Sequence, residues 1–172
     1  MILTGNKISN EVKNNKIIIS PFNIERLSTN SYDITLSDTL IEYTSPILDP
    51  KKKSEYKIIK IPNDGYILPK NSFHLGSSNE IIGSEYYVPI LHAKSGIARL
   101  GLFVHITADL IDIGSIGNIT FQLYSTLPVK VYKDMKIGQM SFWKPHGRIS
   151  LYDGKYMNSR GPQISKTYLD WK

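Results

Sequence analysis

The stretch LIDIGSIGNITFQLYST, residues 110–126, carries the clearest pattern in the chain and decides how the fold is predicted. Its second half alternates with the period of two that is typical of a β-strand. One face carries Ile119, Phe121 and Leu123, and the other carries Thr120, Gln122 and Tyr124. If the apolar face packs in a core, the polar face points to solvent, a cavity or a neighbouring subunit. The glutamine in the middle of that polar face is therefore either ordinary sheet chemistry or the remnant of a catalytic carboxylate.

Length and composition indicate a single globular domain. A chain of 172 residues buries about two thirds of the surface that its unfolded form exposes. No apolar run approaches the ~20 residues that span a bilayer, and the N-terminal MILTGNKISNEVKNNK lacks the apolar core of a signal peptide. We therefore expect a cytoplasmic protein without a membrane partner.

The absence of cysteine narrows the possible chemistry. It excludes disulfides, a thiol nucleophile and cysteine-ligated zinc, and with them the zinc deaminases, whose metal needs cysteine ligands. The histidines do not show the spacing of metal ligands, and we interpret them as packing or hydrogen-bonding residues. They are His74, His92, His105 and His146. No metal site built from protein side chains is predicted.

The chain is basic, with a formal net charge of +6. Part of the excess lies in DPKKKSEYKIIK, residues 49–60, which predicts an exposed loop. Further cations near the C-terminus are Lys155, Arg160, Lys166 and Lys172. Such a surface can attract a small polyanion such as a triphosphate, bind nucleic acid, or simply be solvated. Because the sequence has no recognition helix and no aromatic-rich single-strand motif, nucleic acid is the least favoured partner.

Short strands dominate the expected secondary structure. Residues 5–14 predict a short helix, because Ile8 and Val12 lie four apart on one face. From residue 16 onward, short alternating segments are separated by Gly, Pro, Asn and Asp at spacings typical of β-sandwiches and barrels. The pattern loosens after about residue 153 into a polar segment with a Gly-Pro breaker. We divide the chain into a main domain, residues 1–152, and a tail, residues 153–172, which is either mobile or a lid ordered by a ligand.

A phosphate site is indicated around residues 95–101, SGIARLG. This segment predicts one turn of helix after a strand, and such a turn presents free backbone N–H groups. Lys94 precedes it and Arg99 lies within it, so cations and a hydroxyl come close together. The combination suits an anion better than the Ser-Gly pair alone.

Five segments occur in the order, and at about the spacing, of the dCTP deaminases of the dUTPase superfamily, which this chain resembles from about residue 2 to 168. They are NSYDITL (30–36), AKSGIARLGL (93–102), HITADLIDIGSIGNITFQLYS (105–125), LPVKVYKDMKIGQMSF (127–142) and KYMNSRGPQISK (155–166). The resemblance implies a dUTPase-like distorted β-barrel or jelly roll, assembled as a homotrimer with active sites between subunits. It also implies dCTP or dUTP as the ligand, with Mg²⁺ held by the triphosphate and no zinc.

The resemblance implies roles for residues around the phosphates and the attacking water. Ser95 matches a phosphate-binding serine, and Arg99 matches a nearby structural or catalytic arginine. Lys94 replaces an arginine that contacts phosphate, so the charge is kept and the bidentate geometry is lost. Ala108 matches the residue whose backbone carbonyl holds the attacking water, in a Thr107–Ala108 pair that the family shares.

Further residues match groups around the sugar and the lid. Asp112 matches an aspartate near the deoxyribose, which activates water in relatives that cleave pyrophosphate. Tyr152 and Lys155 match tail residues that close over the nucleotide. Ser159 lies where many relatives carry a glutamine that contacts the ligand. The segments IDIG and GSIG depart from the more common IDPG and G-aromatic-x-G forms.

Gln122 is the departure with the largest consequence. By the resemblance it stands at the family's glutamate, the general base that takes a proton from water attacking C4 of cytosine. An amide has the same shape but cannot accept and return that proton, so we predict a dCTP deaminase-like hydrolase with impaired deamination. Three interpretations stay open: an experimental replacement that traps substrate, a natural variant that cleaves a phosphoanhydride with Asp112 and Mg²⁺, and a catalytically inactive nucleotide-binding protein.

Overall fold

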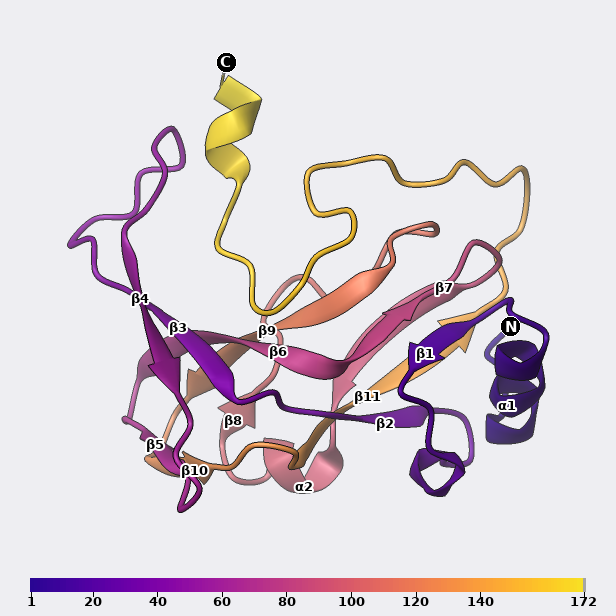
Figure 1. The fold of residues 1–172 in the computed structure, drawn as a ribbon, viewed down its shortest axis with the longest axis horizontal. Coiled ribbons are helices and arrows are strands. Elements are labelled where there is room, and N and C mark those ends of the chain that lie inside the picture. Colours follow the sequence, from indigo (N-terminus) through magenta and orange to yellow (C-terminus); the bar gives the residue numbers. More distant parts are fainter. Residues whose placement is uncertain (172) are drawn as a thin grey trace.

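The computed structural model describes residues 1–171, so Lys172, one of the C-terminal cations, lies outside the described residues. Residues 1–171 form antiparallel sheets and a few short helices, joined by loops (Figure 1). The prediction of a mainly β fold with a short N-terminal helix is confirmed, because α1 covers Gly5–Lys13 and strands follow it from residue 18 onward. Within residues 1–171, no helix is both long enough and apolar enough to cross a membrane.

The largest sheet has the strand order β4-β3-β6-β9-β8, and β1 pairs with β6 outside this path. Its strands are β1 (Ile18–Ser20), β3 (Thr39–Tyr43), β4 (Tyr56–Lys60), β6 (Ser72–Gly83), β8 (Leu102–Phe103) and β9 (Gly117–Ser125). A three-stranded sheet has the order β2-β11-β7, formed by Tyr32–Thr35, Lys136–Trp143 and Val88–Ala93. A two-stranded sheet pairs β10 (Val129–Val131) with β5 (Tyr66–Leu68), and the short helices are η1 (Ile24–Arg26), α2 (Ser95–Ala98) and η2 (Thr167–Trp171).

Strand β9 has the alternation that its sequence predicts. Phe121 and Leu123 are fully buried in the core, and Ile119 packs against the same core while partly exposed. Thr120 and Gln122 lie on the opposite face and are half-buried. β9 pairs with β6 along one edge and with β8 along the other. Its side chains therefore point only to the two faces of the sheet. The apolar face therefore takes the core, and the polar face is left for a cavity.

Strand β2 differs from its prediction because both of its faces are buried. The alternation of SYDITL puts Tyr32 and Ile34 on a core face, and both are fully buried. The intervening Asp33 and Thr35 are buried as well, with 8% and 1% of their surface exposed. The second face is covered because Thr35 meets the carboxylate of Glu80 from β6, a contact between sheets that alternation within one strand cannot indicate.

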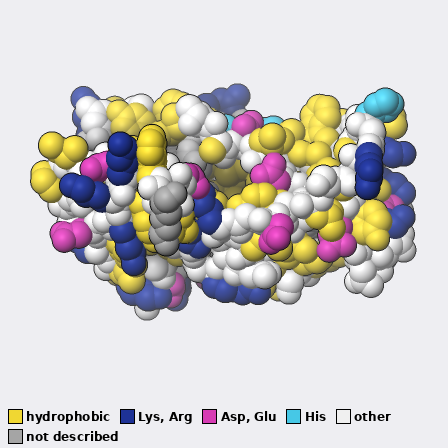
Figure 2. All heavy atoms as spheres, turned by 90° about the horizontal axis from the view of Figure 1, so that it is seen from above, with side chains coloured by type: hydrophobic (Ala, Val, Ile, Leu, Met, Phe, Trp, Pro, Cys, Tyr) yellow, Lys and Arg dark blue, Asp and Glu magenta, His cyan; other side chains and the backbone are white. Residues whose placement is uncertain are grey.

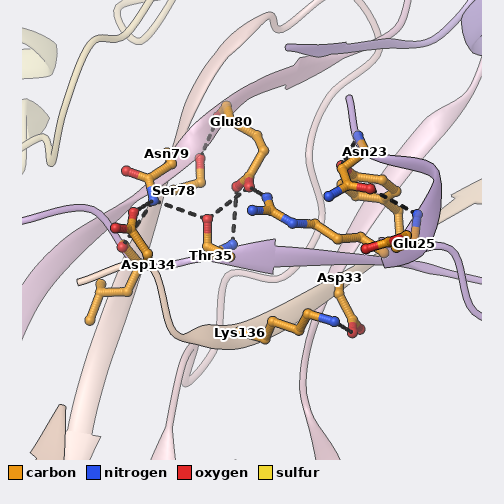
Figure 3. Close-up of polar contacts among 12 residues, drawn as sticks. Asn23, Glu25, Asp33, Thr35, Ser78, Asn79, Glu80, Asp134 and Lys136 are labelled. Atoms are coloured by element: carbon orange, nitrogen blue, oxygen red, sulfur yellow. Dashed lines mark hydrogen bonds and ion pairs between the residues drawn. The ribbon is translucent and has the colours of Figure 1, made fainter. Parts of the chain in front are cut away.

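The buried carboxylate of Glu80 is the centre of a polar network (Figure 3). It accepts hydrogen bonds from the backbone N–H of Thr35 at 3.0 Å and from the Thr35 hydroxyl at 2.8 Å. Arg26 of η1 forms an ion pair with it. Asn79 donates to the Thr35 hydroxyl at 3.0 Å and to Asp134 at 2.8 Å, which extends the network to the turn before β11. The network thus joins η1, β2 and β6.

The lysine run lies in an exposed loop, as its sequence predicts. Lys51, Lys52 and Lys53 are exposed and connect β3 to β4. Figure 2 shows lysine and arginine side chains at the end of the molecule that carries this hairpin, with hydrophobic and charged side chains interspersed along the rest of the face. On this face the cations are therefore spread out rather than gathered into one stripe.

The buried His74 on β6 predicts a loss of stability in mild acid. Burial lowers its pKa below the ordinary 6.5, Lys57 lowers it further, and Glu42 opposes both. As pH falls, the unfolded chain takes up a proton before the folded protein does, so the free energy of unfolding decreases below about pH 6.5. Chemical denaturation between pH 7 and pH 5 measures this decrease. His74→Gln should make the decrease smaller but not abolish it, because burial also lowers the pKa of His92; an unchanged pH dependence in this variant would contradict the assignment.

Candidate active site

A cavity of about 550 Å³ opens over β6 and β9. Its volume lies in the range of small-molecule sites. The lining includes the polar face of β9, the loop that precedes β9 and the C-terminal tail, together with residues of β3, β6 and β7. Lining residues from β9, the loop and the tail include Asn118, Thr120, Gln122, Ala108, Ser159 and Gln163. Segments far apart in sequence therefore meet around one hollow.

Gln122 faces this cavity and is held in one orientation. Its Oε1 accepts a hydrogen bond from the backbone N–H of Ile106 at 3.3 Å. Its own backbone N–H donates to the carbonyl of Val104 at 2.9 Å, so residues 104–106 lie beside β9. Oε1 already accepts from Ile106 and keeps one further lone pair, whereas the side-chain NH₂ group offers two donors to a ligand. Gln122 can therefore donate to a bound molecule, but it has no basic group to offer.

Ala108 and Ser159 lie around the same cavity as Gln122. Ala108 follows Ile106 by two residues, so the backbone that fixes the Gln122 amide leads directly into the cavity wall. Ser159 approaches from the tail, and its hydroxyl donates to the carbonyl of Tyr156 at 2.6 Å. Thr107, predicted beside Ala108, is not among the lining residues.

Asp112 and Tyr152 line a neighbouring cavity of about 480 Å³. The two cavities share Ile111 as a wall, so they are adjacent. The backbone of Tyr152 donates to the carbonyl of Ile113 at 2.8 Å, and its phenol oxygen accepts from the N–H of Tyr156 at 3.2 Å. A single chain thus places the predicted sugar-side aspartate next to, and outside, the cavity that contains Gln122.

The predicted phosphate residues around α2 line neither cavity. Lys94 donates to Asp33 at 2.6 Å, and that carboxylate is also 3.8 Å from Lys136. Ser95 begins α2 and Arg99 follows it. The structure of one chain therefore brings Ala108, Gln122 and Ser159 together but leaves the α2 group apart from them.

The tail is packed against the body of the protein. It crosses β9 between residues 159 and 163 and ends in η2, above the sheet (Figure 1). Lys155, predicted to close over the nucleotide, forms an ion pair with Asp170 of η2. That the tail closes over a ligand as a lid stays a prediction.

Protein ligands for a metal are not gathered anywhere in residues 1–171, where no three His, Cys, Asp or Glu side chains lie close enough to hold an ion. Mg²⁺ keeps several waters and commonly takes its remaining oxygens from substrate phosphates. A magnesium ion bound to a triphosphate would therefore not require a dedicated set of protein ligands in this chain. The magnesium stays a prediction.

A family model described as dCTP deaminase-like matches residues 2–145. The chain belongs to the dCTP deaminase-like family. A relative from Clostridium beijerinckii, named "dCTP deaminase, dUMP-forming", is 40% identical over 100% of this chain and 99% of its own length. One of the same name from Clostridium botulinum (strain Eklund 17B / Type B) is 38% identical over 100% of this chain and 99% of its own.

A solved structure supports the fold. The 2'-deoxycytidine 5'-triphosphate deaminase from Agrobacterium tumefaciens superposes with a TM-score of 0.67 at 16% identity. The match covers 84% of this chain and 48% of that chain, so it spans about half of the other protein. At this identity the likeness concerns the fold of the dCTP deaminase-like domain alone.

Sequence reasoning missed several residues that shape the cavity of this dCTP deaminase-like chain. Asn118 and Gln163 both line it, and Tyr43 of β3 does so from the other side. One signal for Asn118 was present, because the alternation that marks Thr120 and Gln122 extends back to it. Nothing local indicates Gln163 or Tyr43, since their place depends on where the tail crosses the sheet.

Proposed function

We propose that this protein is a dCTP deaminase-like pyrimidine deoxynucleotide hydrolase in which deamination is impaired. The observation that carries the proposal is the position of Gln122, whose amide faces a nucleotide-sized cavity beside Ala108. Deamination adds water to C4 of cytosine and expels ammonia, and it needs a group that takes a proton from the water and returns one to the leaving nitrogen. General acid–base catalysis of this kind contributes about 10²–10⁴-fold in rate. An amide supplies hydrogen bonds without supplying that step.

The ligand that we propose is dCTP, which agrees with the names of the relatives, or dUTP. The Gln122 amide and the Ala108 carbonyl would contact the base and the water, and Ser159 would approach the ligand from the tail. Hydrolysis of dUTP to dUMP and pyrophosphate uses water at a phosphorus atom, so it depends on Asp112 rather than on residue 122. A bound Mg²⁺ would neutralise the triphosphate.

We further propose that the protein is a homotrimer and that a neighbouring subunit supplies the phosphate-binding residues. Supporting this, Lys94, Ser95 and Arg99 lie outside both cavities of a single chain. In such an assembly α2 of one subunit would face the Gln122 cavity of the next. Sedimentation measures the assembly, and a monomer that binds nucleotide at full strength would contradict it.

A product assay tests the proposed function. The protein is incubated with Mg²⁺ and either dCTP or dUTP, and the nucleotides, ammonia and pyrophosphate are quantified. We expect dCTP to bind with little ammonia released, and pyrophosphate to appear from dUTP. Rapid conversion of dCTP to dUTP or dUMP would contradict the impairment.

A non-catalytic nucleotide-binding protein is the second candidate, acting as a sensor, a regulator or a sponge. It is favoured by the combination of an amide at Gln122 with a lysine at 94 that is paired with Asp33. Tight binding of dCTP or dUTP with neither ammonia nor pyrophosphate released would select it over the hydrolase.

A further inference from the structure

The backbone of the tail is held on the sheet by hydrogen bonds, one to the backbone of β9 and three to side chains of β9 and β3. Residues 159–165 do not form a strand of the sheet, yet every second residue makes a hydrogen bond to it. The four contacts are Asn118 N to Ser159 O (2.9 Å), Gly161 N to Asn118 Oδ1 (3.0 Å), Gln163 N to Thr120 Oγ1 (3.1 Å) and Ser165 N to the Tyr43 hydroxyl (2.9 Å). Together these four contacts tie residues 159–165 to one position along the sheet, and so define one register for the tail.

The side-chain nitrogen of Asn118 is held by a β-bulge in the neighbouring strand β6. The pairing of β6 with β9 shifts register between Ser77 and Ile81, which leaves the carbonyls of the bulged residues without ladder partners. The Asn118 Nδ2 donates to those of Ser78, Asn79 and Glu80 at 3.0, 3.3 and 3.1 Å. With Nδ2 held in the bulge, Oδ1 must point towards the tail, where Gly161 uses it.

The bulge itself is anchored from behind. The Glu80 side chain accepts hydrogen bonds from Thr35 (Figure 3) and forms an ion pair with Arg26, so the bulge that holds Asn118 is tied into the buried core. Gly117 adds a second constraint, because a Cβ there would lie 2.8 Å from the N and O atoms of Ser159. The sheet surface is therefore shaped to receive the tail backbone at this point.

The register of the tail decides what closes the Gln122 cavity. Ser159 and Gln163, which flank the Gly161 contact, both line that cavity. A shift of the tail by one residue would break its contacts with Asn118 and Thr120 and move both side chains from their places in the cavity wall. We infer that Asn118 and Thr120 are positioning residues, which hold the tail in register and so set the outer wall of the nucleotide site.

The effect on nucleotide rests on the proposed function, whereas the docking of the tail does not. Thr120→Val keeps the shape of the side chain and removes the acceptor for Gln163, while Thr120→Ser keeps the acceptor. In ligand-free protein, we expect hydrogen exchange at the Gly161 and Gln163 amides to be several-fold faster in Thr120→Val than in the wild type, and near wild-type in Thr120→Ser. The affinity for dCTP with Mg²⁺ should fall by roughly three- to tenfold in Thr120→Val, the size expected for one hydrogen bond, and should be restored in Thr120→Ser.

Two further measurements keep the outcomes separate. Tyr43→Phe removes the acceptor for Ser165 from the opposite side, and it should speed exchange of the tail in the same way. Wild-type exchange in Thr120→Val, or no rescue in Thr120→Ser, would overturn the inference. A loosened tail with unchanged nucleotide affinity would overturn the positioning role. If the wild-type protein binds no dCTP or dUTP at all, the proposed function fails, and exchange in the ligand-free variants still decides whether Thr120 and Tyr43 dock the tail.

Discussion

Gln122→Glu is expected to raise the rate of dCTP deamination by roughly 10²–10⁴-fold. The glutamate has the shape of the glutamine, and one of its oxygens can accept the Ile106 N–H that now binds Oε1. Its other oxygen then takes the place of the NH₂ group on the cavity side, where it can accept a proton from water. The substitution therefore adds a base without removing a contact that holds the strand. Release of ammonia from saturating dCTP measures the change.

The matched control places the same chemical change elsewhere in the same cavity. Gln163→Glu adds one carboxylate to the wall formed by the tail, so it has the same effect on the net charge without a base at residue 122. Deamination should stay low in this variant. If Gln122→Glu binds dCTP and still releases no ammonia, the cavity has diverged beyond one residue, and the non-catalytic interpretation becomes the better one.

The position of Gln122 could be predicted because strand alternation is a local property. Residues 119–124 contain the information about which side of β9 is buried, and Phe121 and Gln122 lie as that pattern predicts. The order of the motifs predicted the family, and the match of the family model to residues 2–145 confirms this prediction. The mainly β fold follows from the same short periodic segments.

The walls of the cavity depend on contacts between distant parts of the chain, which no local pattern reports. Asn118 meets Gly161 across 43 residues, and Tyr43 meets Ser165 across 122. The buried polar face of β2 has the same origin, since Thr35 meets Glu80 from 45 residues away. Local sequence patterns report even less about whether Lys94 and Arg99 lie at a phosphate, because in our proposal that contact requires a second subunit.

Removing Arg26 is expected to destabilise the fold more than any other single change proposed for this chain. Arg26→Ala leaves the Glu80 carboxylate, which has 0% of its side chain exposed, without a cation. Breaking a buried ion pair from one side costs about 3–5 kcal/mol in the free energy of unfolding. We expect about 3 kcal/mol, the lower end of that range, because 23% of the Arg26 side chain is exposed and water can enter where it is removed. Urea unfolding at a fixed protein concentration measures the loss.

The double variant Arg26→Ala/Glu80→Gln separates the buried charge from the lost packing. The glutamine is neutral, and its oxygen can still accept the N–H of Thr35, so the double variant should be more stable than Arg26→Ala alone. Lys60→Ala breaks the exposed pair with Asp38 and should change stability little, since such pairs contribute little. An Arg26→Ala variant no less stable than Lys60→Ala would mean that Glu80 is held by its hydrogen bonds to Thr35 without help from a cation. The bulge of β6 that holds Asn118 would then be anchored by β2 alone.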